Sequence, residues 1–94
     1  MLKFEGKVIE WRGPAPHHFV PTSAELAFEI DKLASHLSYG WGCIPVDVTI
    51  GQTNFYTALI PREGVYYVPL KVSVRKAESV ELGQTVAITL HFNT

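Results

Sequence analysis

Cysteine and charge are both scarce in this sequence. Cys43 is the only cysteine, which excludes an internal disulfide and any metal site built from several cysteines. Charged residues make up 18% of the chain, and the formal net charge is −1. Binding to a nucleic-acid backbone requires a concentrated basic surface. We therefore do not expect nucleic acid as a partner, and the lone cysteine fits the reducing conditions of the cytoplasm.

Long apolar runs and phosphate-binding loops are also missing. No apolar stretch reaches the roughly 18 residues that a membrane span needs, and residues 1–5 lack the apolar core of a signal peptide. The chain has no glycine-rich phosphate loop and no nucleophile elbow. The sequence thus predicts a soluble cytoplasmic protein that has no cofactor and does not bind membranes.

Length and apolar content predict one domain over residues 1–94. A single core normally serves chains of about 100 to 150 residues, and 47% of this chain is hydrophobic. The low charge is combined with 2 Trp, 4 Tyr and 5 Phe. Part of this apolar surface is then expected to be covered, and a second subunit is the simplest cover. We therefore expect a homo-oligomer.

Residues 65–92 predict a strand, a short helix and a second strand. Residues 65–68 and 86–92 are rich in β-branched and aromatic side chains, and the second run alternates. Between them, Leu70, Val74 and Ala77 have the spacing of one helical face, and Gly83 provides a turn. Because a helix connects the two strands, we expect them to be either non-neighbours or parallel.

The first part of the chain predicts another strand and one long helix. Residues 2–11 alternate imperfectly, and Gly6 marks a bulge or a close backbone crossing. Residues 22–25 have the form of a capping box, with a hydroxyl at the N-cap and Glu25 at N3. The helix is expected to end at Tyr39-Gly40. Its apolar stripe consists of Leu26, Ile30, Leu33 and Leu37, with Ala27 and Ala34 beside them.

Residues 46–60 predict a hairpin whose loop comprises residues 51–54, and residues 61–64 predict a further turn. Tight turns between strands imply mainly antiparallel pairing. The predicted fold class is therefore mostly β: a small barrel of short strands with one long amphipathic helix and one short helix.

Three separated blocks of the sequence are similar to one protein family. The blocks are Glu10-Trp11-Arg12-Gly13-Pro14-Ala15-Pro16 with Phe19-Val20-Pro21, Tyr39-Gly40-Trp41-Gly42-Cys43-Ile44-Pro45-Val46, and Pro69-Leu70-Lys71-Val72-Ser73-Val74-Arg75-Lys76-Ala77-Glu78. In this order they resemble the small bacterial and archaeal domain of unknown function 1905, over nearly the whole chain. The resemblance implies a closed double-split barrel, which in that family occurs alone or ahead of a YdeI/OmpD-associated segment. It implies no established activity, substrate or cofactor.

The basic helix, the turn and the last predicted strand are also similar to part of the transition-state-regulator (AbrB-like) barrels, which bind DNA as dimers. Those proteins generally have Gly-Asp at the turn where this chain has Gly83-Gln84, and they carry basic strands that this chain lacks. The similarity therefore concerns the fold.

Aromatic residues beside glycines indicate a ligand site. Trp11 and Arg12 precede one glycine, and Tyr39 and Trp41 flank two others. Aromatic rings with an arginine are typical of a pocket for a small ligand or a peptide, in which Arg12 would bind an anionic group. The alternative is that Trp11 and Trp41 plug the ends of the barrel, with Arg12 stacked on one of them.

His17, His18 and Arg75 are the other candidate site residues. The two histidines would need a third ligand to hold a metal, and no typical ligand spacing links them to one. We therefore expect no metal. Arg75 offers a second anion-binding group, or it belongs to a solvated basic face of the short helix. The candidate third ligands are His36, His91 and Asp47, and the basic neighbours of Arg75 are Lys71 and Lys76.

Three functions are compatible with these residues. The first is a non-enzymatic binding module that holds a small ligand or peptide near Trp11, Arg12 and Trp41. The second is a small enzyme that uses His17 or His18 with Arg12 or Arg75, which requires these groups to converge in one cleft. The third is an AbrB-like nucleic-acid binder, which requires one contiguous basic face built from Lys71, Arg75, Lys76 and Arg62. The first requires least of the sequence, and it is the function that we predict.

Overall fold

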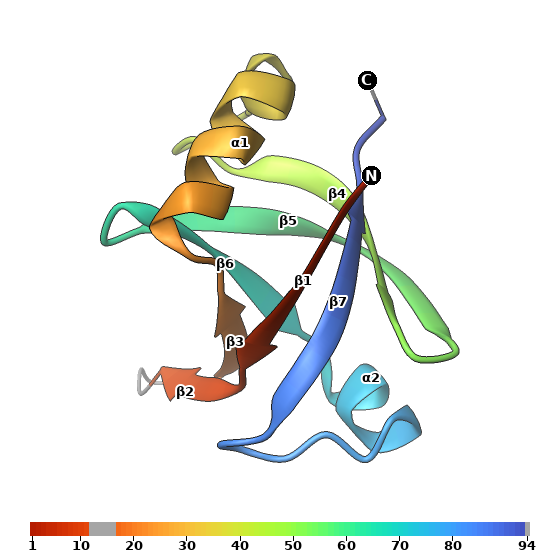
Figure 1. The fold of residues 1–94 in the computed structure, drawn as a ribbon. Coiled ribbons are helices and arrows are strands. Elements are labelled where there is room, and N and C mark those ends of the chain that lie inside the picture. Colours follow the sequence, from red (N-terminus) through yellow and green to blue (C-terminus); the bar gives the residue numbers. More distant parts are fainter. Residues whose placement is uncertain (12–16, 94) are drawn as a thin grey trace.

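The computed structural model describes residues 1–11 and 17–93, which form seven strands, two α-helices and one 3-10 turn. The strands are β1 (Leu2–Lys7), β2 (Ile9–Trp11), β3 (His17–Pro21), β4 (Ile44–Ile50), β5 (Thr53–Arg62), β6 (Val65–Leu70) and β7 (Thr85–His91). The helices are α1 (Ala24–Ala34), which continues into the 3-10 turn η1 (Ser35–Leu37), and α2 (Val72–Ala77). The predicted mostly-β fold with one longer and one shorter helix is confirmed (Figure 1).

The strands form one curled, half-barrel sheet in the order β1-β7-β4-β5-β6-β3-β2, and the described pairs are all antiparallel. The strands on either side of α2, β6 and β7, are not neighbours, in agreement with one of the two expected arrangements. The first and last strands of this order, β1 and β2, are consecutive in sequence and separated only by Val8. The bent N-terminal segment therefore brings the two edges of the sheet together.

A close crossing at Gly6 allows this closure. A Cβ atom at Gly6 would collide with the Val20 side chain of β3 and would lie 3.3 Å from the carbonyl oxygen of Pro21. Only glycine lets two backbones approach so closely. Beyond the crossing, the Val8 amide donates to the carbonyl oxygen of Gln84, and the Gly83 amide donates to that of Val8, both at 2.9 Å. The close crossing predicted from the sequence is confirmed.

The core lies between the inner face of the sheet and helix α1. Alternate residues of β4 and β7 are buried, as period-2 alternation predicts for a sheet with one covered face. Full burial of one such aliphatic side chain stabilises the fold by about 1.5 to 3 kcal/mol. The largest fully buried side chains are Ile30, Ile44, Leu59, Leu70, Ile88 and Leu90.

Helix α1 begins one residue later than the capping-box pattern predicts. Ser23 is the N-cap, and its Oγ accepts a hydrogen bond from the amide of Leu26 at 3.1 Å. Thr22 is buried instead, where its hydroxyl accepts from the Tyr66 amide at 3.1 Å and its own amide donates to the Tyr66 carbonyl at 2.8 Å. The predicted capping box was therefore wrong, because pairing with β6 holds Thr22 outside the helix.

The helix also ends earlier than expected, and its buried stripe differs. α1 stops at Ala34 and the 3-10 turn at Leu37, before the predicted end at Tyr39-Gly40. The fully buried helix residues are Ala27, Ile30 and Ala34, whereas Leu33 is 41% exposed. Of the four predicted stripe residues, Ile30 alone is fully buried, and Ala27 and Ala34 supply the rest of the buried face.

Two other boundaries differ from the sequence prediction. Leu70 is the last residue of β6 rather than the first residue of a helix, because it pairs with His18 on β3. The hairpin loop between β4 and β5 is only residues 51–52, and β5 continues to Arg62. The turn that follows uses Glu63 and Gly64, both with positive φ.

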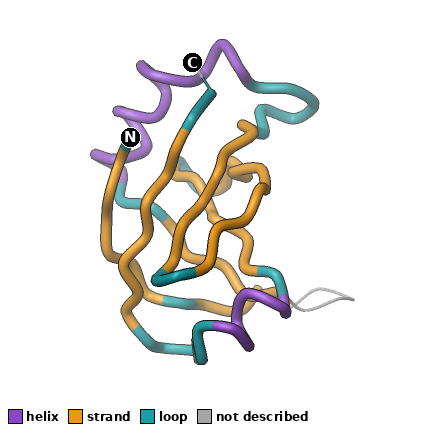
Figure 2. The backbone as a smooth tube through the Cα atoms, turned by 90° about the vertical axis from the view of Figure 1, so that its right-hand side faces the viewer, coloured by secondary structure: helices purple, strands orange, loops and turns teal. Residues whose placement is uncertain are grey.

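Figure 2 shows both termini at the end of the molecule that carries α1, while α2 lies at the opposite end. Neither helix in the described part of the chain is long and apolar enough to cross a membrane.

Candidate functional site

The structure divides the predicted site residues among three places. Arg12 lies outside the described residues. His17 and His18 are consecutive on β3, so their side chains lie on opposite faces of the sheet. His17 is exposed, as are Trp11, Tyr39 and Trp41, whereas His18 is partly buried near Arg75. The two histidines therefore cannot act together in one cleft.

The first place is an aromatic cluster on the outer face of β2, β3 and β6. Trp11 pairs with His17 across the β2–β3 ladder. Both rings pack against Phe19, at centroid distances of 6.4 Å for Trp11 and 6.0 Å for His17. Tyr67 of β6 covers Phe19 from the other side at 5.7 Å. We call these four residues the aromatic surface. Phe19 lies on the outer face of the sheet, yet the other three rings leave it only 5% exposed.

Arg62 adds a positive charge to the aromatic surface. Its guanidinium carbon lies 4.0 Å from the ring centroid of Trp11, a cation–π contact. In the sheet, β6 and β3 lie between β5, which carries Arg62, and β2, which carries Trp11. The side chains of Arg62 and Trp11 therefore meet over the outer face of β6 and β3. Within the described chain, no carboxylate forms an ion pair with Arg62. Sequence reasoning considered Arg62 only as part of a basic face and missed its contact with Trp11, because only the sheet order brings β5 near β2.

The second place is a tight loop that presents Trp41. The Tyr39 amide donates to the Cys43 carbonyl at 2.8 Å, and the Cys43 amide donates back to the Tyr39 carbonyl at 3.0 Å. Trp41, at the tip of this loop, has φ 65° and is 97% exposed. The alternative in which Trp41 plugs the barrel is therefore wrong.

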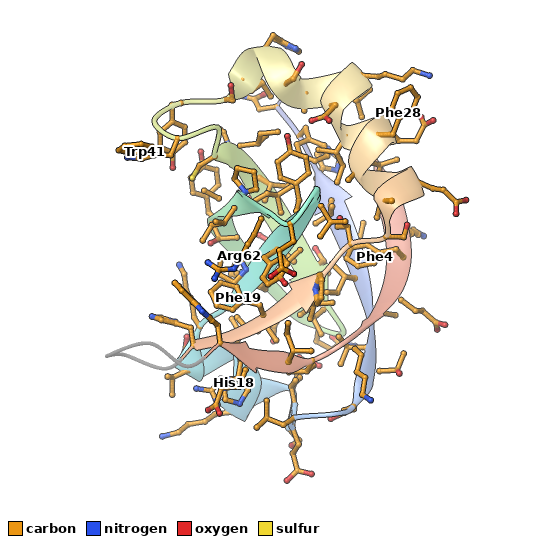
Figure 3. The ribbon with its side chains drawn as sticks, turned by 90° about the vertical axis from the view of Figure 1, so that its left-hand side faces the viewer. Phe4, His18, Phe19, Phe28, Trp41 and Arg62 are labelled. Carbon is orange, nitrogen blue, oxygen red and sulfur yellow. The ribbon has the colours of Figure 1, made fainter. Side chains whose placement is uncertain are left out.

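The Trp41 loop lies beside the end of β5 that carries Arg62. A Cβ atom at Gly42 would lie 3.3 Å from Cγ of Pro61, the residue before Arg62. Figure 3 shows Arg62 and Phe19 near each other and Trp41 on the same side of the molecule, pointing outward. The loop is thus a neighbour of the aromatic surface rather than part of it.

The third place is the inner side of β3, where His18 meets Arg75 of α2. Nη1 of Arg75 lies 3.4 Å from Nε2 of His18. Burial, reinforced by the positive charge of Arg75, lowers the pKa of His18 below its ordinary value, against the opposing effect of Glu10. The neutral imidazole is therefore favoured, and its Nε2 can accept a hydrogen bond from the guanidinium. Nδ1 of His18 and Nε of Arg75 are buried and have no partner among the described residues.

The structure also shows where the residues of the metal and nucleic-acid alternatives lie. Within residues 1–11 and 17–93, no group of three His, Cys, Asp or Glu side chains is placed to hold a metal. Asp47 and His91, two of the expected third ligands, pair with each other on β4 and β7. Of the four residues of the predicted basic face, Arg62 contacts a ring on the outer face of the sheet, whereas Arg75 contacts a ring on the inner face.

Comparison with known proteins places the chain in a family. No curated protein matches the chain at a significant level. A family model described as Domain of unknown function (DUF1905) matches residues 4–90. This match covers most of β1 and of β7, the strands that join the two ends of the chain. It agrees with the resemblance carried by the three sequence blocks, and the chain therefore belongs to the DUF1905 family of domains of unknown function.

Proposed function

We propose that this protein is a non-enzymatic binding module that holds a small ligand or a peptide on the aromatic surface. Arg62 binds an anionic group of the ligand, the rings of Trp11 and Tyr67 contact its apolar part, and the Trp41 loop closes one side. The observation that supports this proposal is the guanidinium of Arg62, held 4.0 Å above the Trp11 ring without an ion-pair partner among the described residues.

The position of Arg62 favours an anionic ligand. Stacking on an aromatic face holds the guanidinium plane but uses none of its five N–H donors. A carboxylate matches these donors in a bidentate geometry, which gives both affinity and orientation. Trp11 is 45% exposed, so a ligand on Arg62 would also reach the indole. The ligand class is therefore a carboxylate joined to a planar or apolar group, as in the C-terminal residue of a peptide.

The geometry of Trp41 favours a contact role over a structural one. A non-glycine residue with positive φ costs about 1 to 2 kcal/mol relative to the right-handed region. The exposed indole makes no ring contact in the described chain that would offset this cost. Aromatic side chains are enriched in binding interfaces because they bury a large area with few rotatable bonds. A ligand covering Trp41 would supply the missing contact.

The test uses the presence of only two tryptophans. Trp41→Phe leaves Trp11 as the sole indole, and Trp11→Phe leaves Trp41. Each single-tryptophan protein is titrated with short peptides that end in a hydrophobic residue, and with the same peptides carrying a C-terminal amide. We expect a saturable change in Trp11 emission with the acid form, and weaker binding of the amide by about tenfold, the size of a charged hydrogen bond.

Arg62 supplies the matched variants. Arg62→Ala removes the guanidinium, and Arg62→Lys keeps the charge but loses the planar fork. We expect both variants to remain folded and to weaken binding, the alanine more than the lysine. Equal affinity of the acid and amide peptides, or unchanged binding in Arg62→Ala, would show that the aromatic surface does not recognise an anion.

A small enzyme that uses His18 with Arg75 is the second candidate function, favoured by the 3.4 Å contact between these residues. A histidine kept neutral by burial and a nearby cation is suited to act as a general base. This function predicts that any activity found in a substrate screen is lost in His18→Gln and retained in His17→Gln. Activity that survives His18→Gln would exclude this role.

A further inference from the structure

A row of three polar side chains crosses the outer face of the other part of the sheet. Asp47 on β4 is paired with His91 on β7 and with Tyr56 on β5. Directly paired residues lie on the same face, with Cβ atoms about 4.5 to 5.5 Å apart. The carboxylate therefore has an imidazole on one side and a phenol on the other. These three strands are neighbours in the sheet, in the order β7-β4-β5.

The row lines a pocket of about 400 Å³. Leu37 of η1 and Phe92 add apolar contacts, and Asn93 adds an amide. Asp47, Tyr56 and His91 form no side-chain hydrogen bond or ion pair with any other residue that the structure describes. Their polar atoms are thus available to a ligand. A volume of this size lies within the range of small-molecule sites.

We propose that this pocket binds a small organic cation, a protonated amine or a quaternary ammonium group. Asp47 is its counter-ion, the ring of Tyr56 contributes a π face, and His91 and Asn93 hydrogen-bond to the remainder of the ligand. The site is distinct from the aromatic surface around Arg62 and does not depend on it.

The charges around the pocket select this class of ligand. Among the described residues that line the pocket, Asp47 is the only charged one, and none is a lysine or an arginine. An anion would meet an unpaired carboxylate, whereas a cation neutralises it. A carboxylate beside an aromatic ring is the combination that recognises ammonium groups. A divalent metal would need a further ligand, since the described chain places no group of three ligating side chains together.

The experiment is a titration followed by two-dimensional ¹H–¹⁵N NMR of the full chain. The probe is choline, and its matched control is 3,3-dimethylbutan-1-ol, which has the same shape but no charge. Butylammonium tests a primary amine. We expect choline and butylammonium to shift the amide signals of residues 46, 47, 56 and 91–93, and the neutral alcohol to leave them in place. Binding is also expected to weaken at high salt, because Asp47 is only partly buried.

Variants test each partner separately. Asp47→Asn keeps the shape of the side chain and removes its charge, and we expect it to weaken choline binding by about tenfold or more. Tyr56→Leu, which removes the ring, is expected to weaken binding by about two- to fivefold, and Tyr56→Phe is expected to retain it. Glu5→Gln is the matched control for charge, since Glu5 is an exposed carboxylate on another strand of the same sheet.

Three outcomes would overturn the proposal. The first is equal binding of choline and the neutral alcohol, because the charge would then contribute nothing. The second is unchanged choline affinity in Asp47→Asn while the variant keeps its dispersed NMR spectrum. The third is the absence of signal shifts up to about 50 mM choline, a concentration far above a roughly millimolar dissociation constant.

Discussion

The two halves of the curled sheet have the same kind of inner face and different outer faces. Inside, both β7–β4 and β6–β3 present aliphatic side chains to the core. Outside, the β6–β3–β2 half has an aromatic surface with one arginine, whereas the β7–β4 half has a polar row centred on Asp47. Strand β5 belongs to both halves and contributes Arg62 to one and Tyr56 to the other.

This difference shows that the fold constrains the inward-facing side chains more than the outward-facing ones. Any inward-facing set of Val, Ile and Leu of similar volume would close this barrel. The outward-facing side chains do not have to fill a core. A sheet with one solvated face normally carries polar residues on that face. The aromatic surface departs from this expectation because its residues are large rings. The Asp47 row agrees with it in being polar, but the row also lines a pocket. The two outer faces therefore carry groups of opposite charge and are suited to different ligands.

The strongest test of the common core is Leu59→Ala on the shared strand β5. Leu59 is fully buried, and its truncation leaves a cavity that both halves line, so we expect a loss of about 2 to 5 kcal/mol in the free energy of unfolding. Urea unfolding should remain one transition when followed both by tryptophan emission and by circular dichroism. Two separated transitions would show that the two halves unfold independently and do not share one core.

A smaller loss in the free energy of unfolding is expected when the hydrogen bond between helix α1 and strand β6 is removed. The Tyr66 hydroxyl donates to Oδ1 of Asp31 at 2.5 Å, and burial together with this bond raises the pKa of Tyr66 from 10.0 to about 12. Tyr66→Phe should lower the free energy of unfolding by about 1 to 3 kcal/mol, the range for a hydrogen bond to a charged group. Denaturant midpoints at neutral pH measure it, with Tyr67→Phe on the opposite face of β6 as control.

The hydrogen bond between Tyr66 and Asp31 also predicts that the free energy of unfolding depends on pH in the alkaline range. The folded state holds the phenol proton more tightly than the unfolded state, so this stabilisation is present below pH 10 and is lost as pH rises through about 12. The wild-type protein should therefore lose stability faster than Tyr66→Phe over this interval. Parallel slopes for the two proteins would contradict the role given to the Tyr66–Asp31 bond.

Neighbouring histidines allow an inner face and an outer face to be compared at acid pH. Burial and Arg75 lower the pKa of His18 from 6.5, so the folded state favours the neutral ring. The resulting stability is present above pH 6.5 and is lost as pH falls below it. Stability measured between about pH 7 and pH 5 should thus decline less in His18→Gln than in the wild-type protein. His17→Gln, on the outer face, should follow the wild-type profile.

The smallest effects concern the two tryptophans. Trp11→Ala removes an indole that contacts both Phe19 and Arg62, and we expect a loss of about 1 kcal/mol in the free energy of unfolding. Trp41→Ala should change it by less than about 0.5 kcal/mol, because the side chain is 97% exposed. Thermal melting of both variants measures the difference. A larger loss in Trp41→Ala than in Trp11→Ala would reverse the roles assigned to the two tryptophans.

Local patterns in the sequence were sufficient for the elements and the fold class. Alternation along residues 46–50 and 86–92 marked strands with one buried face, and Gly6 marked the crossing where β1 meets β3. The capping box was wrong by one residue, since Ser23 and Thr22 are both competent caps and only pairing with Tyr66 decides between them. Such competition between local signals is settled by contacts that are distant in sequence.

The sites depended on strand order and register, which local patterns do not encode. A period of two predicts that His17 and His18 face opposite ways, but it does not predict that α2 places Arg75 against His18. Arg62 and Trp11 are far apart in sequence, as are Asp47 and His91, and each pair meets because particular strands become neighbours at a particular register. The sequence by itself determined which faces are apolar, because burial follows local periodicity. Only the tertiary structure decided which outward groups meet, because one residue of register shift would move every one of them to the opposite face.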